Sequence, residues 1–258
     1  MNTHRVFSAL ISAAIVLAAS VTASAVTYNL NTIHTAPIDT LDGRAYFTTD
    51  ILKTTGTGVI NPFLSIQAGP TESGYNISSG VLDTKRDGQY TRTQQVSDLQ
   101  TVVVDGTSYY AFLIDINESN SAASSKISID SIKIYTSGSL LTSLSALQTS
   151  GTLQFDIDSL SNTTLLYDDL NTGSGQGDIA FFIPTSALAG VASTDYFYLY
   201  QQFGGAGGPY SSDSGFEETR HGGDLTFIPI PETNAIFPIL AVLGVVVAGP
   251  FVRRCFHP

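Results

Sequence analysis

The chain has 258 residues and a net charge of −11 at pH 7; 43% of its residues are hydrophobic and 13% are charged. This apolar content excludes an intrinsically disordered protein, and the acidic balance argues against a nucleic-acid partner, because phosphate contacts need clustered lysine and arginine. The single cysteine excludes a disulfide framework and a multi-cysteine metal site.

The first 25 residues carry the three parts of a secretory signal peptide in order. Arg5 supplies the positive start, Val6–Ala19 is an apolar run, and the small residues Ala23 and Ala25 form the cleavage pattern. We therefore expect a signal helix at 1–25, export through the Sec pathway, and cleavage by signal peptidase after Ala25. A buried core helix is the alternative interpretation.

Residues 26–229 are predicted to form one extracellular domain. This region holds eight basic residues and 21 of the 22 acidic residues, which gives it a net charge near −13. Polar and apolar side chains alternate over 153–158, as in a half-buried strand. The segments 179–183 and 196–203 are apolar on both faces, which predicts central strands. Short strands between Gly, Ser, Thr, Asn and Asp loops predict an all-β antiparallel sandwich of jelly-roll type.

Local patterns add detail to this prediction. Asp105-Gly106, between Thr101–Val104 and Thr107–Asn117, predicts a β-hairpin, because both turn positions favour positive φ. Asp87-Gly88 predicts a second hairpin, between 81–86 and 89–93. A change of parity between Ile129 and Ile132 predicts a β-bulge near Ser131. Helical signals are short and confined to 140–147 and 185–188.

A second apolar segment, residues 235–252, contains no charged side chain and precedes Arg253 and Arg254. Its 18 residues would make a helix of about 27 Å, close to the thickness of a bilayer core. Basic residues favour the cytoplasmic side of a membrane. The sequence thus predicts a single transmembrane helix that holds the exported chain at the membrane, with a basic tail at 253–258.

The box Pro231-Glu232-Thr233, the apolar segment and Arg253-Arg254 together resemble the PEP-CTERM sorting signal of exopolysaccharide-producing Gram-negative bacteria. Thr233 stands where the family has a second proline. The resemblance implies a sorting signal over 230–258 that is processed by an exosortase, a membrane-embedded transpeptidase. The segment 230–234 also resembles the pentapeptide of sortase substrates, so a sortase-anchored cell-wall protein is an alternative.

The body carries further resemblance to this family. The segment 195–203, followed by Gly204-Gly205 and by Gly215-Phe216-Glu217-Glu218, is similar to a segment common among PEP-CTERM proteins, with Thr219 in the place of a tryptophan. The segments 112–117, 128–134 and 170–184 also resemble that group. The resemblance implies a protein of the cell surface or extracellular matrix, associated with exopolysaccharide and biofilm, and it transfers no enzymatic activity to the body.

Two candidate sites lie in the body. Asp168, Asp169, Asn171 and Asp178 flank a glycine-rich stretch, and such hard oxygen ligands on adaptable loops suit Ca²⁺. Tyr196, Tyr198 and Tyr200 share one parity and are candidates for stacking on a polysaccharide, although a core position is the more common role of such residues.

No catalytic constellation stands out in the sequence. Asp156 and Asp158 share a strand parity and are candidates for the two acids of a glycosidase, but a solvated strand face is the favoured explanation, because β-sandwiches commonly carry polar outward faces. We therefore expect a non-enzymatic exported protein. The alternatives are a carbohydrate-binding module or Ca²⁺-dependent adhesin and, with less support, a polysaccharide-degrading enzyme.

Overall fold

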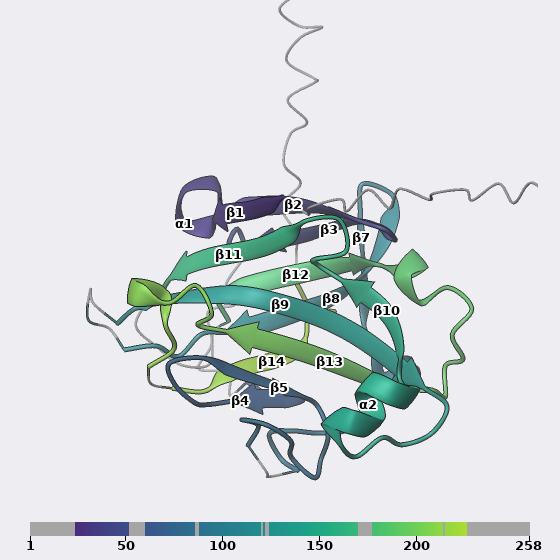
Figure 1. Ribbon diagram of the computed structural model, residues 1–258. Coiled ribbons are helices and arrows are strands. Elements are labelled where there is room, and N and C mark those ends of the chain that lie inside the picture. Colours follow the sequence, from purple (N-terminus) through teal and green to yellow (C-terminus); the bar gives the residue numbers. More distant parts are fainter. Residues whose placement is uncertain are drawn as a thin grey trace, which may run out of the picture.

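The computed structural model describes residues 24–51, 60–85, 88–119, 121, 124–169, 177–213 and 215–225. Within these ranges the chain forms two β-sheets that pack face to face, with few and short helices (Figure 1). The predicted all-β sandwich is therefore confirmed. Residues 1–23 and 226–258 lie outside the described residues, and with them most of the predicted signal helix and the whole predicted transmembrane helix. Among the helices of the described ranges, none has the length and apolar character needed to cross a bilayer.

The first sheet, sheet A, has the strand order β1-β11-β9-β13-β5, with β10 beside β9 and β6 beside β13. Its strands pair antiparallel except for β1, which runs parallel to β11. This pair differs from the predicted antiparallel arrangement, because no tight turn joins β1 to β11 and imposes a direction. The strands are β1 (Ala25–Asn29), β5 (Glu72–Tyr75), β6 (Gln94–Gln95), β9 (Lys126–Ser137), β10 (Thr152–Asp156), β11 (Asn162–Asp168) and β13 (Tyr196–Phe203).

The second sheet, sheet B, has the order β2-β3-β12-β8-β14-β4, with β7 beside β8, and all its pairs are antiparallel. Its strands are β2 (Thr35–Thr40), β3 (Gly43–Thr48), β4 (Leu64–Ile66), β7 (Thr101–Val104), β8 (Thr107–Asp115), β12 (Ile179–Pro184) and β14 (Glu217–His221). The helical elements are α1 (Leu30–Ile33), α2 (Leu144–Ser150) and the 3₁₀ turns η1 (Val96–Asp98), η2 (Thr185–Leu188) and η3 (Gly208–Tyr210).

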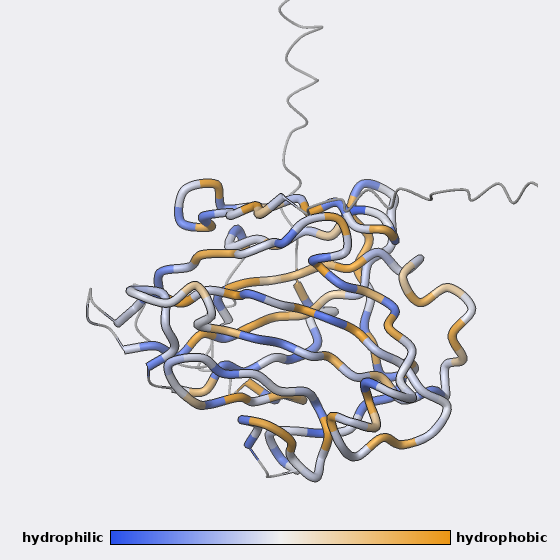
Figure 2. Tube along the Cα trace, viewed as in Figure 1, coloured by the Kyte–Doolittle hydropathy of each residue, from blue (hydrophilic) through white to orange (hydrophobic). Residues whose placement is uncertain are grey.

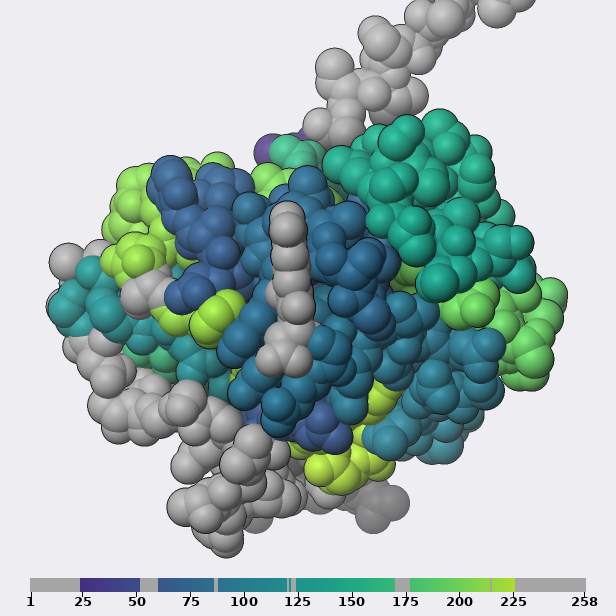
Figure 3. Space-filling view, turned by 90° about the horizontal axis from the view of Figure 1, so that it is seen from below, coloured from purple at the N-terminus to yellow at the C-terminus, as the bar shows by residue number. Residues whose placement is uncertain are grey.

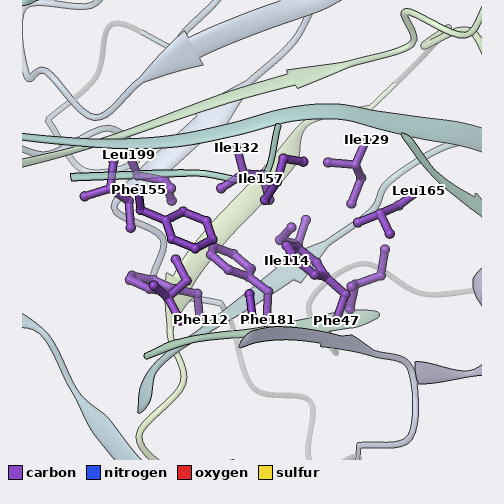
Figure 4. Packing of buried hydrophobic residues seen from close by; sticks show 14 of the residues in the cluster. Phe47, Phe112, Ile114, Ile129, Ile132, Phe155, Ile157, Leu165, Phe181 and Leu199 are labelled. Carbon is purple, nitrogen blue, oxygen red and sulfur yellow. The ribbon is translucent and has the colours of Figure 1, made fainter. Parts of the chain in front are cut away.

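The core lies between the two sheets and is built from isoleucine, leucine and phenylalanine side chains of both (Figure 4). Phe112 and Phe181, on neighbouring strands of sheet B, stack with their ring centroids 4.7 Å apart. Phe47 extends this stack on one side and Phe197 on the other, the latter from sheet A. Hydrophobic and hydrophilic residues alternate along β9 and β13 (Figure 2), because one face of sheet A meets this core and the other faces outward.

Several local predictions are confirmed. β7 and β8 form the predicted hairpin, in which Asp105 and Gly106 have φ values of 48° and 78°. β9 carries the predicted bulge: Ser131 pairs with Gln202 and Ile129 pairs with Phe203, which leaves Asp130 as the extra residue. The inserted residue changes the parity of β9, so the isoleucines on both sides of it point into the core. The apolar segments 179–183 and 196–203 form central strands, and helical turns occur within both predicted segments.

Two local predictions are wrong. The stretch around Asp87-Gly88 forms turns instead of a hairpin in its described part, because the backbone groups of Asp83 and Lys85 bond to strands β4 and β5 and their connection. Leu153 does not share the core face of Phe155: it is 49% exposed, whereas Phe155 is buried. A register shift between these two residues in the β9–β10 ladder separates their faces.

Candidate functional site

A pocket of about 480 Å³ opens on the outer face of sheet A. Its floor is formed by outward side chains of β5, β9 and β13, and α2 forms one wall. In Figure 1, α2 lies beside β13 and β5, and Figure 3 shows the teal residues around α2 next to blue residues of an earlier part of the chain. The pocket is lined by Ser73, Tyr75, Leu82, Asp130, Ser131, Lys133, Tyr135, Leu144, Leu147, Gln148, Asp158, Tyr200 and Gln202.

The wall exists because α2 is fixed at its N-terminus and on one side. The Ser143 hydroxyl accepts a hydrogen bond of 3.1 Å from the Ala146 amide, which caps the first turn. Leu147 is 1% exposed and packs against Tyr75 and Tyr198 in the apolar cluster on the outer face of sheet A. Gln148, one residue further along, is exposed and lines the pocket.

Three tyrosines line the pocket. Tyr135 and Tyr200 are half-buried, whereas Tyr75 is fully buried, with its ring centroid 5.9 Å from that of Tyr200. Burial raises the pKa of Tyr75 and of Tyr200, so both phenols are protonated at neutral pH. The Tyr200 hydroxyl donates a 3.3 Å hydrogen bond to Gln202 Oε1. The pocket therefore combines two partly accessible aromatic rings with polar side chains.

Of the tyrosines predicted from the sequence, only Tyr200 lines this pocket. Tyr198 is fully buried, and its hydroxyl accepts a 2.7 Å hydrogen bond from the Leu141 amide. Tyr196 is half-buried and lies outside the lining. Tyr75 and Tyr135 were missed, because they reach the pocket through cross-strand pairs with Tyr200 and Tyr198 that only the register of the sheet specifies.

Two hydroxyl groups at the floor of the pocket have no hydrogen-bond partner among the described residues: Tyr75 Oη and Ser131 Oγ. Both oxygens are buried beneath the residues that line the pocket. An unsatisfied buried hydroxyl costs about 1–3 kcal/mol, so these two groups favour any ligand that supplies a polar partner.

The charges of the pocket are mostly acidic. Lys133 Nζ lies 2.8 Å from Asp156 Oδ2, so this ammonium is already paired. Asp130 accepts hydrogen bonds of 2.8 Å from Ser128 Oγ and 2.6 Å from the Gly205 amide. Burial raises the pKa of Asp158, which accepts a 2.8 Å hydrogen bond from the Thr163 amide. Of the two acids predicted as a pair, Asp158 thus lines the pocket and Asp156 holds Lys133.

The predicted calcium ligands have structural partners. Asp168 accepts a 2.6 Å hydrogen bond from Ser125 Oγ, and Asp178 accepts one of 2.8 Å from the Ile116 amide. Asp169 is buried, and Asn171 lies outside the described residues. Over the part of the chain that the structure describes, no three His, Cys, Asp or Glu side chains are arranged to hold a metal ion.

The predicted processing sites fall at or beyond the ends of the fold. Ala25 is exposed and is the first residue of β1, while Ala23 lies outside the described residues. Pro231, Glu232, Thr233, Arg253 and Arg254 also lie outside them. The processing predictions therefore remain predictions. Comparison of the chain with protein-family models, with curated proteins and with solved structures finds no match.

Proposed function

We propose that the chain is an exported, non-enzymatic protein of a Gram-negative cell surface or extracellular matrix, and that its body binds polysaccharide in the pocket on sheet A. The observation that carries the binding proposal is the joint lining of one pocket by Tyr135, Tyr200 and hydrogen-bonding groups such as Gln148 and Gln202. Ligand sites combine aromatic surface with a few placed polar groups in this way, and their volumes run from about 300 to 1,000 Å³.

The chemistry of a sugar matches this lining. A pyranose ring has an apolar face of C–H groups that packs on an aromatic ring, and a rim of hydroxyls that both donate and accept hydrogen bonds. The amides of Gln148 and Gln202 and the carboxylates of Asp130 and Asp158 offer partners for such a rim. The floor hydroxyls of Tyr75 and Ser131 add two groups that lack partners in the described structure.

The route to the outside is proposed from the two ends of the chain. Signal peptidase would remove 1–25, the helix at 235–252 would hold the chain in the inner membrane, and an exosortase would cut at Pro231-Glu232-Thr233. A sortase is the alternative processing enzyme. The jelly-roll connectivity of the sandwich and a Ca²⁺ ion at Asp168, Asp169, Asn171 and Asp178 are the remaining parts of the sequence-based proposal.

Replacing Tyr200 by alanine is expected to weaken binding of the responsive polysaccharide by about tenfold, because it removes one aromatic contact worth about 1.4 kcal/mol. Tyr200→Phe should retain most of the affinity, since the ring remains. Binding would be measured by a glycan array and then by calorimetry on the full-length chain in mild detergent.

Tyr28→Ala is the matched control, because Tyr28 is a half-buried tyrosine on β1, at the opposite edge of sheet A. Equal losses for Tyr28→Ala and Tyr200→Ala would contradict the pocket as the binding site. Release of new reducing ends from the bound polysaccharide would contradict a non-enzymatic role and would direct attention to Asp130 and Asp158.

The sorting proposal predicts a shortened mature protein. Intact-mass spectrometry of the exported form should show a chain that begins after Ala25 and lacks Arg253 and Arg254, because both lie beyond the predicted cut. The matched control is the same chain with Pro231→Ala and Glu232→Ala, which should keep its C-terminus. A mature extracellular protein with an intact C-terminus would refute processing at this box.

A further inference from the structure

Two glutamates face each other inside the sandwich, one from each sheet. Glu72 lies on β5 of sheet A, Glu217 lies on β14 of sheet B, and each is 1% exposed. Both side chains point into the sandwich. Glu72 pairs directly with the core residue Phe203, so the two side chains lie on the same face of sheet A. Glu217 shares a face of sheet B with Thr219, two residues further on, which donates a 2.8 Å hydrogen bond to Gln201 of the opposite sheet. The two carboxyl groups lie within hydrogen-bonding reach of each other.

The rest of the described chain donates few hydrogen bonds to these carboxyl groups. Glu72 Oε2 accepts a 2.6 Å hydrogen bond from the Ala68 amide. Glu72 Oε1 and both oxygens of Glu217 receive no hydrogen bond from any donor in the described ranges. A carboxylate has acceptors only, so a contact between two ionised groups contains no hydrogen atom to bridge them.

The charged groups near the pair are acidic. The loop after β8 contributes Glu118, which is 6% exposed, and the loop before β14 contributes Asp213, whose amide donates to Glu118 at 3.3 Å. Glu218 follows on β14 and accepts from Ser65 of β4, while β13 contributes the neutral Gln201. Lys85 is a base that interacts with Glu218, and its ammonium lies over the rings of Tyr90 and Phe216.

Burial raises the pKa of Glu217 well above its usual range, and the neighbouring carboxyl groups of Glu72 and Glu118 raise it further. Burial, together with Asp213, raises the pKa of Glu118 to about 8. Two carboxylates at this separation in an apolar interior cannot both be ionised without a large electrostatic cost. A proton between them removes one charge and supplies the missing donor.

We propose that Glu217 keeps its proton at neutral pH and donates it in a hydrogen bond to Glu72, so that the pair forms a proton-dependent clasp between the two sheets. The clasp lies at one edge of the sandwich. There β5 is the edge strand of sheet A, and β14 pairs with β4, the edge strand of sheet B. These three strands lie together in Figure 1. As the pH rises, the proton passes to water and leaves two adjacent carboxylates, whose repulsion separates the sheets at this edge. The clasp therefore makes the body more stable at mildly acidic pH than at alkaline pH.

Proton linkage gives the direction in which stability changes with pH. A folded-state pKa above the unfolded value means that the folded chain binds more protons, so the stabilisation is complete below about pH 4.5 and is lost as the pH rises through the folded pKa. Between pH 5 and 9 we expect the midpoint of urea unfolding of the full-length chain to fall. Glu217→Gln should reduce the proton-linkage slope by about one proton, because a glutamine amide donates to Glu72 permanently.

We expect Glu217→Gln to be more resistant to urea than the wild type at pH 9 and no more resistant at pH 5. Asp105→Asn is the matched control: it removes one acidic charge at an exposed turn, where asparagine accepts the positive φ, and it should leave the slope unchanged. Equal effects of Glu217→Gln at both pH values would overturn the clasp.

A measurement on the wild type keeps the test independent of whether the variant folds. The side-chain carboxyl ¹³C shifts of Glu72 and Glu217, followed by NMR, should show one protonated carboxyl group in the pair at pH 7. Full ionisation of both at pH 7 would overturn the proposal. So would a rise in unfolding midpoint with millimolar Ca²⁺ at pH 8 in the wild type but not in Glu217→Gln, because a cation would then neutralise the pair.

Discussion

Replacing Phe112 by alanine is expected to lower the free energy of unfolding by about 3–5 kcal/mol, the usual cost of truncating a buried phenylalanine. Phe112 is fully buried on β8 and stacks on Phe181 at 4.7 Å. It also stacks on Phe197 of the opposite sheet at 5.9 Å and meets the edge of Phe63 at 6.2 Å. Removing this ring opens a cavity where the two sheets meet, and rigid strands on both sides prevent the core from closing it.

The loss is large because domains of this kind are stable by only about 5–15 kcal/mol. It would be measured as a shift in the midpoint of urea unfolding, with the pH held fixed. Val103→Ala is the control: Val103 lies on the adjacent strand β7 but is 69% exposed, so its truncation should change stability by less than about 0.5 kcal/mol. Similar losses for both variants would contradict the assigned core.

Asn76→Ala is expected to cost about 2–5 kcal/mol, although asparagine is a polar residue. Asn76 is fully buried next to the end of β5. Its Oδ1 accepts a 2.6 Å hydrogen bond from the Leu199 amide, and its Nδ2 donates one of 3.0 Å to the Phe197 carbonyl. Alanine leaves both backbone groups of β13 without partners, and each such buried group costs about 1–3 kcal/mol.

Hydrogen exchange and urea unfolding together test this prediction. The Leu199 amide should lose protection in Asn76→Ala beyond the change in global stability, because its acceptor has been removed. Asn162→Ala, at an exposed position of β11, is the control and should leave both measurements unchanged within about 0.5 kcal/mol. Unaltered stability of Asn76→Ala would mean that water replaces the amide and that the site is less enclosed than its burial indicates.

Sequence patterns predicted those parts of the fold that depend on neighbouring residues. The Asp105-Gly106 hairpin followed from the φ preference of its two turn residues, and the bulge of β9 followed from the parity of its isoleucines. The prediction of a second hairpin at Asp87-Gly88 was wrong for the opposite reason. Its backbone hydrogen bonds go to β4, β5 and their connection, strands that the local turn signal cannot specify.

The residues of the candidate pocket also divide into those that a local sequence pattern indicates and those that only strand pairing brings together. Tyr200 was identified because it belongs to an aromatic strand visible in the sequence. Tyr75 and Tyr135 were missed, since each comes from a different strand and reaches the pocket through register alone. Tyr198 has the parity of Tyr200, yet the chain leading into α2 covers it, and no periodicity reveals which part of an outer sheet face a helix will cover.

The sequence by itself determined the class of this protein: a β-rich acidic body, with apolar segments at both ends that predict export and sorting. It did so because composition, alternation and turn chemistry are properties of adjacent residues. Only the tertiary structure decided that Glu72 and Glu217 meet inside the sandwich and that tyrosines of three strands line one pocket. Both arrangements join residues that are distant along the chain, and burial between two packed sheets is what gives them their chemistry.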